Sequence, residues 1–152
     1  EEVSLVEVVD NVITLLKQKS EEKGVILIAH TEPGVPPIQG DGDRLTQLVL
    51  ILLDNALKFS PSGSQVTACL KVEDGAEVLI IKDTGSGISP EDLPYIWERF
   101  YKADKSRASG GTGLGLAIAR QIMELHGAKV DVISACGEGT TFTIRFPLKK
   151  NQ

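Results

Sequence analysis

The order of secondary-structure signals in this sequence predicts an α+β domain, a two-layer α/β sandwich whose mixed, mostly antiparallel sheet carries about three helices on one face. Three observations support this prediction. Apolar side chains recur at helical spacing in three separate segments, most strand-like segments occur as hairpins, and 152 residues suit one compact core. No repeat or linker divides the chain, so we expect a single domain over residues 1–152.

Ordinary start and stop signals bound the three predicted helices. The first runs from residue 5 to about residue 20. The second runs from residue 44 to about residue 59, with Asp43 as its N-cap. The third covers residues 114–126 and is closed by Gly127.

The predicted strands form two hairpins and one separate strand. Residues 65–72 pair with residues 77–82 across a glycine-containing turn, and residues 129–134 pair in the same way with residues 140–146. Residues 25–29 are a short apolar run suited to a further strand. This order of elements places the hairpins in one sheet.

The longest segment without regular structure is residues 83–113, which holds only a short predicted helix at residues 90–99. Most connections in compact domains are much shorter than this one. Loops of this length usually close over a ligand or bind it, so the segment is the first candidate for function.

The composition excludes several classes of protein. The formal net charge is −5, opposite in sign to that of proteins that coat nucleic acid, so we expect no nucleic-acid partner. The longest apolar run, residues 48–53, is too short to span a bilayer, and no charged-then-apolar leader opens the chain. Cys69 and Cys136 form no CxxC site, which predicts free thiols in a reducing compartment.

The second predicted helix changes abruptly from apolar to polar at its end. Asn55 and Lys58 are three residues apart, so they share a face of the helix. An amide oxygen can bind a hard cation and a lysine can bind phosphate, which is one interpretation. The alternative is the solvent-exposed end of a core helix.

An aspartate and two glycines follow the strand that ends the first hairpin, where residues 83–88 read DTGSGI. Asp83 can accept a hydrogen bond from an amino group, while Gly85 and Gly87 let the backbone approach a flat ring. A dinucleotide fingerprint would need a third glycine where Pro90 stands. A simple turn is the other alternative.

A second glycine cluster, GGTGLGL at residues 110–116, opens the third predicted helix. Glycine N–H groups can surround an anion, and a helix N-terminus adds partial positive charge. The chain has no GK[ST] sequence, which excludes a P-loop. A flexible loop is the alternative here, and an ordinary hairpin is the alternative for GEGTTF at residues 137–142.

Taken together, these patterns resemble the ATP-binding domain of sensor histidine kinases, within the superfamily of gyrase, a heat-shock chaperone and mismatch-repair ATPases. The segments similar to the N, G1, F and G2 boxes and to two further kinase motifs are residues 54–59, 83–87, 96–104, 111–115, 124–127 and 137–142. Trp97 stands where the F box usually has phenylalanine. The resemblance spans residues 4–148 and implies the Bergerat ATP-binding fold, with a flexible ATP lid over about residues 89–111.

The resemblance also implies which residues bind ATP. Asp83 would accept a hydrogen bond from the adenine amine. Asn55 would hold Mg²⁺ bridging the phosphates, and Lys58 and Lys102 would neutralise phosphate charge, so these three are the expected catalytic residues. Arg107 is a further candidate for the terminal phosphate. The remaining nucleotide-binding residues would be Phe59, Gly85, Gly87, Ile88, Tyr101, Gly111, Thr112, Gly113, Leu114, Gly115, Leu116 and Thr140.

One position departs from the family pattern. Ile51 stands one helical turn before Asn55, where histidine kinases commonly have a second asparagine and hydrolysing relatives have a glutamate that activates water. Isoleucine can neither bind a cation nor act as a base. We therefore expect Mg·ATP binding with negligible hydrolysis.

The resemblance further implies transfer of the γ-phosphoryl group to a histidine outside this chain. His30 and His126 do not match the phosphoacceptor motif, and we expect both to be structural. The chain would be a cytoplasmic fragment of a membrane-bound kinase, monomeric alone and without membrane contact of its own. Its partners would be the kinase's histidine-bearing dimerisation domain, which makes the full-length protein a homodimer, and a response regulator. The alternatives are a non-catalytic nucleotide-sensing module and an ATP-hydrolysing clamp.

Overall fold

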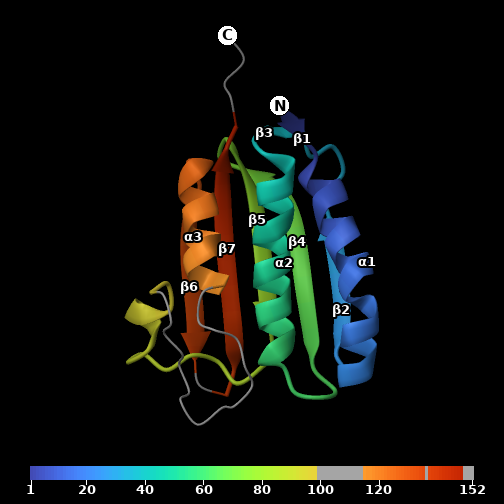
Figure 1. The fold of residues 1–152 in the computed structure, drawn as a ribbon, viewed down its shortest axis with the longest axis vertical. Helices are drawn as coiled ribbons and strands as arrows, with labels where there is room; N and C mark the ends of the chain where they lie inside the picture. Colours follow the sequence, from blue (N-terminus) through green and yellow to red (C-terminus); the bar gives the residue numbers. More distant parts are fainter. Residues whose placement is uncertain (99–114, 136, 149–152) are drawn as a thin grey trace.

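The computed structural model describes residues 1–98, 115–135 and 137–148, and these residues form two layers (Figure 1). Within them, helices lie side by side on one face of a sheet, which confirms the predicted α+β sandwich. The helices are α1 (Leu5–Lys23), α2 (Gly42–Lys58) and α3 (Gly115–Leu125). The central helix, α2, packs against both of the others and against the middle of the sheet.

The main sheet has five strands in the order β2-β4-β5-β7-β6. Their bounds are β2 (Ile26–Thr31), β4 (Gln65–Glu73), β5 (Ala76–Asp83), β6 (Lys129–Ala135) and β7 (Gly139–Pro147). The β4–β5, β5–β7 and β6–β7 pairs are antiparallel, while β2 runs parallel to β4 because α2 lies in the connection between them. The sheet is therefore mixed and mostly antiparallel, as predicted.

A second, two-stranded sheet pairs β1 (Glu2–Val3) with β3 (Ile38–Gln39). The sequence did not predict it, because two-residue strands are too short to show alternation of apolar and polar side chains.

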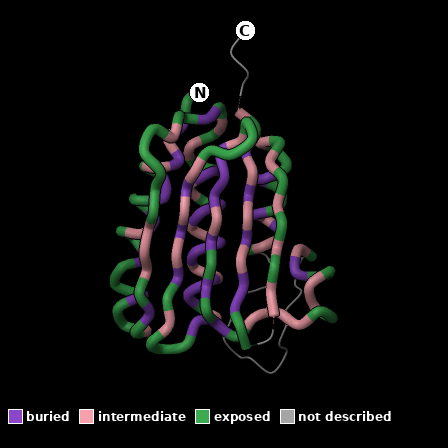
Figure 2. Tube along the Cα trace, turned by 180° about the vertical axis from the view of Figure 1, so that it is seen from behind, coloured by how far each residue is buried: buried purple, intermediate pink, exposed green. Residues whose placement is uncertain are grey.

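The hydrophobic core lies between the helices and the sheet. The apolar face of α2 is almost entirely buried there, with Leu45, Leu48 and Leu52 fully inaccessible. On the other side of the core, alternate residues of the strands point towards the helices, among them Leu79 and Ile144. From behind the sheet, buried and more exposed residues alternate along the central strands (Figure 2). Packing in this core fixes the relative positions of the helices and strands that carry the site.

The N-cap of α2 is Asp41, so the prediction of Asp43 was wrong. Asp41 Oδ1 accepts the N–H groups of Asp43 at 3.1 Å and Arg44 at 3.2 Å. The N–H of Asp41 itself donates to Nε2 of His126 at 3.1 Å. Nδ1 of His126 lies 2.8 Å from the carbonyl oxygen of Ile122, so the ring carries its proton on Nδ1 and joins the end of α3 to the start of α2.

The short α-helix predicted at residues 90–99 was also wrong for the described part of that segment. Residues Leu93–Tyr95 form a single 3₁₀ turn, η1. Pro94 explains the difference, because it has no N–H and disfavours helical conformation in the residue before it. Trp97 follows, and its ring packs edge-on against Phe142 with 5.8 Å between centroids, which ties this segment to β7.

Among the helices that the structure describes, none combines the length and the apolar content needed to cross a bilayer.

Candidate functional site

Three of the sequence motifs meet at the end of the sandwich where α2 ends and α3 begins (Figure 1). They are the polar end of α2, the DTGSGI segment after β5 and the glycine turn between β6 and β7. The loop after β5 lies between the other two. The N–H of Ser86 in this loop donates to the carbonyl oxygen of Phe59, the C-cap residue of α2, at 3.3 Å. The carbonyl oxygen of Ser86 accepts the N–H of Gly137 in the β6–β7 turn at 2.8 Å. Backbone hydrogen bonds thus connect all three motifs.

Two glycines allow these segments to come so close. A Cβ atom on Gly85 would lie 2.3 Å from the carbonyl oxygen of Phe59. A Cβ atom on Gly139 would lie 2.1 Å from the carbonyl oxygen of Asp83, and Gly139 also has a φ of +99°. No other residue fits at either place without moving the backbone.

Asp83 is the buried acidic group of the site. It ends β5, is 6% exposed, and its Oδ1 accepts the N–H groups of Gly85 at 2.9 Å and Thr140 at 3.3 Å. Among the described residues, both hydrogen bonds go to Oδ1, which leaves Oδ2 able to accept another. Burial raises the pKa of Asp83 above its usual value, although the two N–H donors act in the opposite direction.

Ser134, at the end of β6, is a residue of the site that sequence reasoning missed. Its Oγ lies 2.7 Å from the N–H nitrogen of Ile88, 2.8 Å from Thr140 Oγ1 and 3.1 Å from the carbonyl oxygen of Gly139. The geometry is satisfied when Ser134 donates to Gly139 and accepts from the other two. A lone serine at the end of a strand carries no sequence signal for this role.

Asn55 and Lys58 both lie in the last turn of α2. Asn55 is half-buried and Lys58 is exposed. Ile51, one turn before Asn55 on the same face, lies beside the start of α3, because its Cγ2 is 3.5 Å from where a Cβ atom on Gly115 would be. This face of α2 is therefore directed towards the first turn of α3, and it presents the apolar side chain of Ile51 there.

Several predicted site residues cannot be compared with the structure. Those that lie outside the described residues are Tyr101, Lys102, Arg107, Gly111, Thr112, Gly113 and Leu114. Of the GGTGLGL segment, the structure describes only Gly115 and Leu116. Gly115 is exposed as the first residue of α3, and Leu116 is half-buried against the core. The roles of all these residues stay predictions.

The described side chains offer few ligands for a metal ion. No group of three His, Cys, Asp or Glu residues within them could hold one. The carboxylate of Asp54 is engaged by Lys19 at 2.5 Å, which leaves the amide of Asn55 as the hard oxygen donor at the end of α2. One protein oxygen fits an ion that brings its other ligands with it as waters and phosphate oxygens, rather than one held in a protein cage.

The fold and the site together define an ATPase-type domain. They combine a two-layer sandwich with an asparagine at a helix end, a buried aspartate after a strand and glycine turns joined by backbone hydrogen bonds. The chain belongs to the histidine kinase-, DNA gyrase B- and HSP90-like ATPase family, whose sequence profile matches residues 40–150. It is a histidine kinase-type domain, as the following similarities indicate.

Its relatives are sensor kinases. The sensor protein SrrB of Staphylococcus aureus is 44% identical over 109 residues, which cover 70% of this chain and 19% of SrrB, so the chain matches about a fifth of that relative's length. The mycobacterial sensor histidine kinase MprB has 32% identity and a TM-score of 0.86 over 97% of both chains. Full-length ShkA in complex with AMPPNP has 28% identity and a TM-score of 0.87 over 99% of this chain and 31% of that one.

Proposed function

We propose that this domain binds Mg·ATP and passes the γ-phosphoryl group to a histidine on the dimerisation domain of the same sensor kinase. The observation that carries the proposal is the buried carboxylate of Asp83, with Oδ2 available, next to the polar end of α2. The similarity to sensor kinases supports the reaction. Residues 1–152 would then act as one catalytic domain in the cytoplasmic part of a longer kinase.

The adenine base would bind at the end of β5. Asp83 Oδ2 accepts the exocyclic amine, and Phe59 lies against the ring. Ile88 lines the base, in a position that Ser134 and Thr140 support through their hydrogen bonds. Gly85 and Gly87 let the backbone approach the ring closely.

The triphosphate would extend from there towards the first turn of α3. Asn55 and Lys58 approach it from α2, and Lys102, which lies outside the described residues, would neutralise its terminal charge. Backbone N–H groups of residues 111–115 would add donors before α3, whose N-terminus favours anions through the helix dipole. Mg²⁺ bound at Asn55 would neutralise phosphate charge.

The chemistry requires little from the protein beyond positioning and charge neutralisation, because the acceptor imidazole is itself the nucleophile. Neither histidine of this chain suits that role. Both ring nitrogens of His126 are engaged by backbone groups, and His30 lies on β2, an edge strand of the sheet. The acceptor therefore belongs to another domain, and a response regulator would take the phosphoryl group from it.

Ile51 favours transfer over hydrolysis. A water molecule needs a general base to attack the γ-phosphorus efficiently, and an isoleucine at this position cannot provide one. We expect phosphate release by the isolated chain to be negligible, whereas an ATP-hydrolysing clamp would release it continuously.

The test combines γ-labelled ATP, Mg²⁺, this chain and the histidine-bearing hairpin domain of its kinase. We expect label on the hairpin's histidine and almost none in free phosphate. Binding without transfer would favour a nucleotide-sensing module, and rapid phosphate release would favour the clamp. Either result would overturn the proposal.

A further inference from the structure

The last turn of α2 carries Asn55 and Lys58, and neighbouring groups satisfy most of its carbonyl oxygens. The N–H groups of Phe59 and Ser60 donate to Asn55 and Leu57, and Ser60 Oγ donates to Ala56 at 2.7 Å. The last four carbonyl groups of an α-helix have no ordinary intrahelical donor. Many helices solve this with a left-handed glycine after the last turn, but α2 ends at Phe59 with φ −97° and ψ 6°. The carbonyl oxygen of Lys58 receives its donor from a side chain of another helix, which therefore helps to place this turn.

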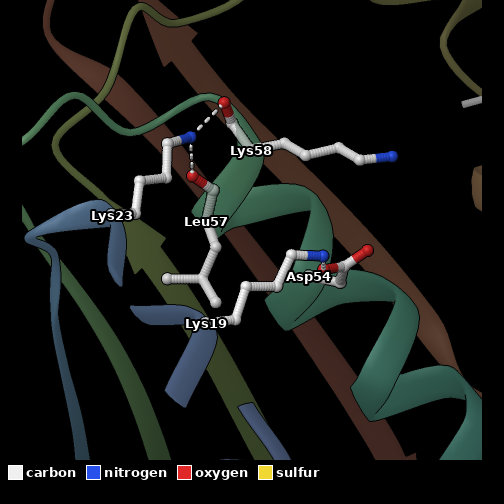
Figure 3. A network of polar contacts seen from close by, with 5 residues as sticks. All are labelled: Lys19, Lys23, Asp54, Leu57 and Lys58. Carbon is white, nitrogen blue, oxygen red and sulfur yellow. Dashed lines mark hydrogen bonds and ion pairs between the residues drawn. The ribbon is translucent and has the colours of Figure 1, made fainter. Parts of the chain in front are cut away.

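Lys23, the last residue of α1, is such a side chain. Its Nζ donates to the carbonyl oxygens of both Leu57 and Lys58, the latter at 2.5 Å (Figure 3). Gly24 ends α1 directly afterwards in the left-handed conformation, with φ +75°. An ammonium group at a helix C-terminus also interacts favourably with the helix dipole.

Lys19 makes a second connection between the two helices. It lies one turn before Lys23 on the same face of α1, and its Nζ is 2.5 Å from Oδ1 of Asp54, the residue before Asn55. The two side chains of this ion pair are 52% and 29% exposed, so the pair adds little to overall stability. Its effect is to restrain the same turn of α2 from a second point.

The side chain of Lys58 takes no part in these contacts. Figure 3 shows it extending away from the network, while its carbonyl oxygen is held by Lys23. The backbone of the turn is thus fixed from α1, and the functional side chains project from that fixed backbone.

We propose that Lys23, assisted by Lys19, is a positioning residue that sets the turn bearing Asn55 and Lys58 for the phosphates and metal of Mg·ATP. This inference rests on the proposed function. The adenine end is held largely by hydrogen bonds around Asp83 and Ser134, and the hydrogen bond from Ser86 to Phe59 joins it to this turn. Loss of Lys23 should therefore weaken binding of the phosphates more than binding of the base, because small displacements of positioned groups have large effects.

The experiment compares Lys23→Met with Lys17→Met. Methionine keeps about the length of the side chain and removes the ammonium group. Lys17 is an exposed lysine on the same helix whose side chain makes no hydrogen bond or ion pair with the described residues. Affinity for Mg·ATP is measured by calorimetry and affinity for adenosine by NMR, at a temperature where circular dichroism shows each variant folded.

We expect Lys23→Met to weaken Mg·ATP about tenfold and adenosine less than about twofold. Lys23→Arg, which keeps a charged donor, should restore most of the loss, and Lys17→Met should change neither affinity. Equal weakening of both ligands, or no weakening, would overturn the positioning role while the proposed function stands. Failure of the unsubstituted chain to bind Mg·ATP would overturn the proposed function, and this inference with it.

Discussion

A buried carboxyl group far from the candidate site should make the stability of this domain depend on pH. Glu77 on β5 is 0% exposed, and within the described residues neither of its carboxyl oxygens has a hydrogen-bond partner. Its cross-strand neighbours, Val72 on β4 and Phe146 on β7, carry no charge. Burial raises the pKa of Glu77 from 4.5 to about 7, because the ionised form loses its hydration.

The sign and size of the effect follow from proton linkage. Below pH 4.5 the carboxyl group is protonated in both the folded and the unfolded chain, so its contribution to stability is fully present. Between pH 4.5 and about 7 the unfolded chain loses the proton and the folded chain keeps it. The free energy of unfolding then falls by about 1.4 kcal/mol per pH unit, about 3 kcal/mol in total, and levels off above pH 7.

Glu77→Gln tests this reasoning, because the amide has nearly the same size and does not titrate. Urea unfolding between pH 4.5 and 8, followed by fluorescence of Trp97, gives the free energy of unfolding of each variant. We expect the wild type to lose about 3 kcal/mol more than Glu77→Gln over this range. Glu73→Gln, at an exposed position on β4, should keep most of the wild-type dependence. Parallel pH profiles for wild type and Glu77→Gln would refute the reasoning.

Contacts within the site predict four further outcomes. Gly139→Ala should lower the free energy of unfolding by about 2 kcal/mol more than Gly137→Ala in urea titrations, since both glycines have positive φ but only Gly139 faces a backbone atom at 2.1 Å. Ser134→Ala should weaken Mg·ATP about tenfold by calorimetry, and an unchanged affinity would remove the hydroxyl from the base-binding end. Asp83→Asn should weaken Mg·ATP at least about tenfold, or 1.4 kcal/mol. Wild-type affinity should also fall as pH is lowered through the raised pKa of Asp83, because the protonated carboxyl group loses an acceptor; a pH-independent affinity would contradict this.

The helices and hairpins could be predicted because their signals are local. The β4–β5 turn is an example, since Asp74 and Gly75 take the positive φ values of 50° and 77° that an Asp-Gly hairpin requires. The start of α2 could not be predicted as well. The choice of Asp41 as N-cap depends on a hydrogen bond to His126, 85 residues further along the chain.

The candidate site likewise contains residues that the sequence could indicate and residues that it could not. The sequence could indicate Asp83 and the glycines, because their spacing is itself a pattern, but the reason for Gly85 and Gly139 appears only where two backbones meet. The sequence around Ser134 and around Lys23 shows no such pattern. Each resembles many other serines and lysines in sequence, and only the fold brings its polar atom to backbone groups of distant motifs.

The central claim is that a purine nucleotide lies between the end of α2 and the glycine turns. An NMR titration of the chain with ATP and Mg²⁺ tests it most directly. We expect saturable shifts of the backbone signals of Gly85, Ser134 and Thr140 and of the side-chain amide of Asn55, with signals near Glu77 unchanged. Spectra that do not change, or shifts confined to the opposite end of the sheet, would contradict the claim.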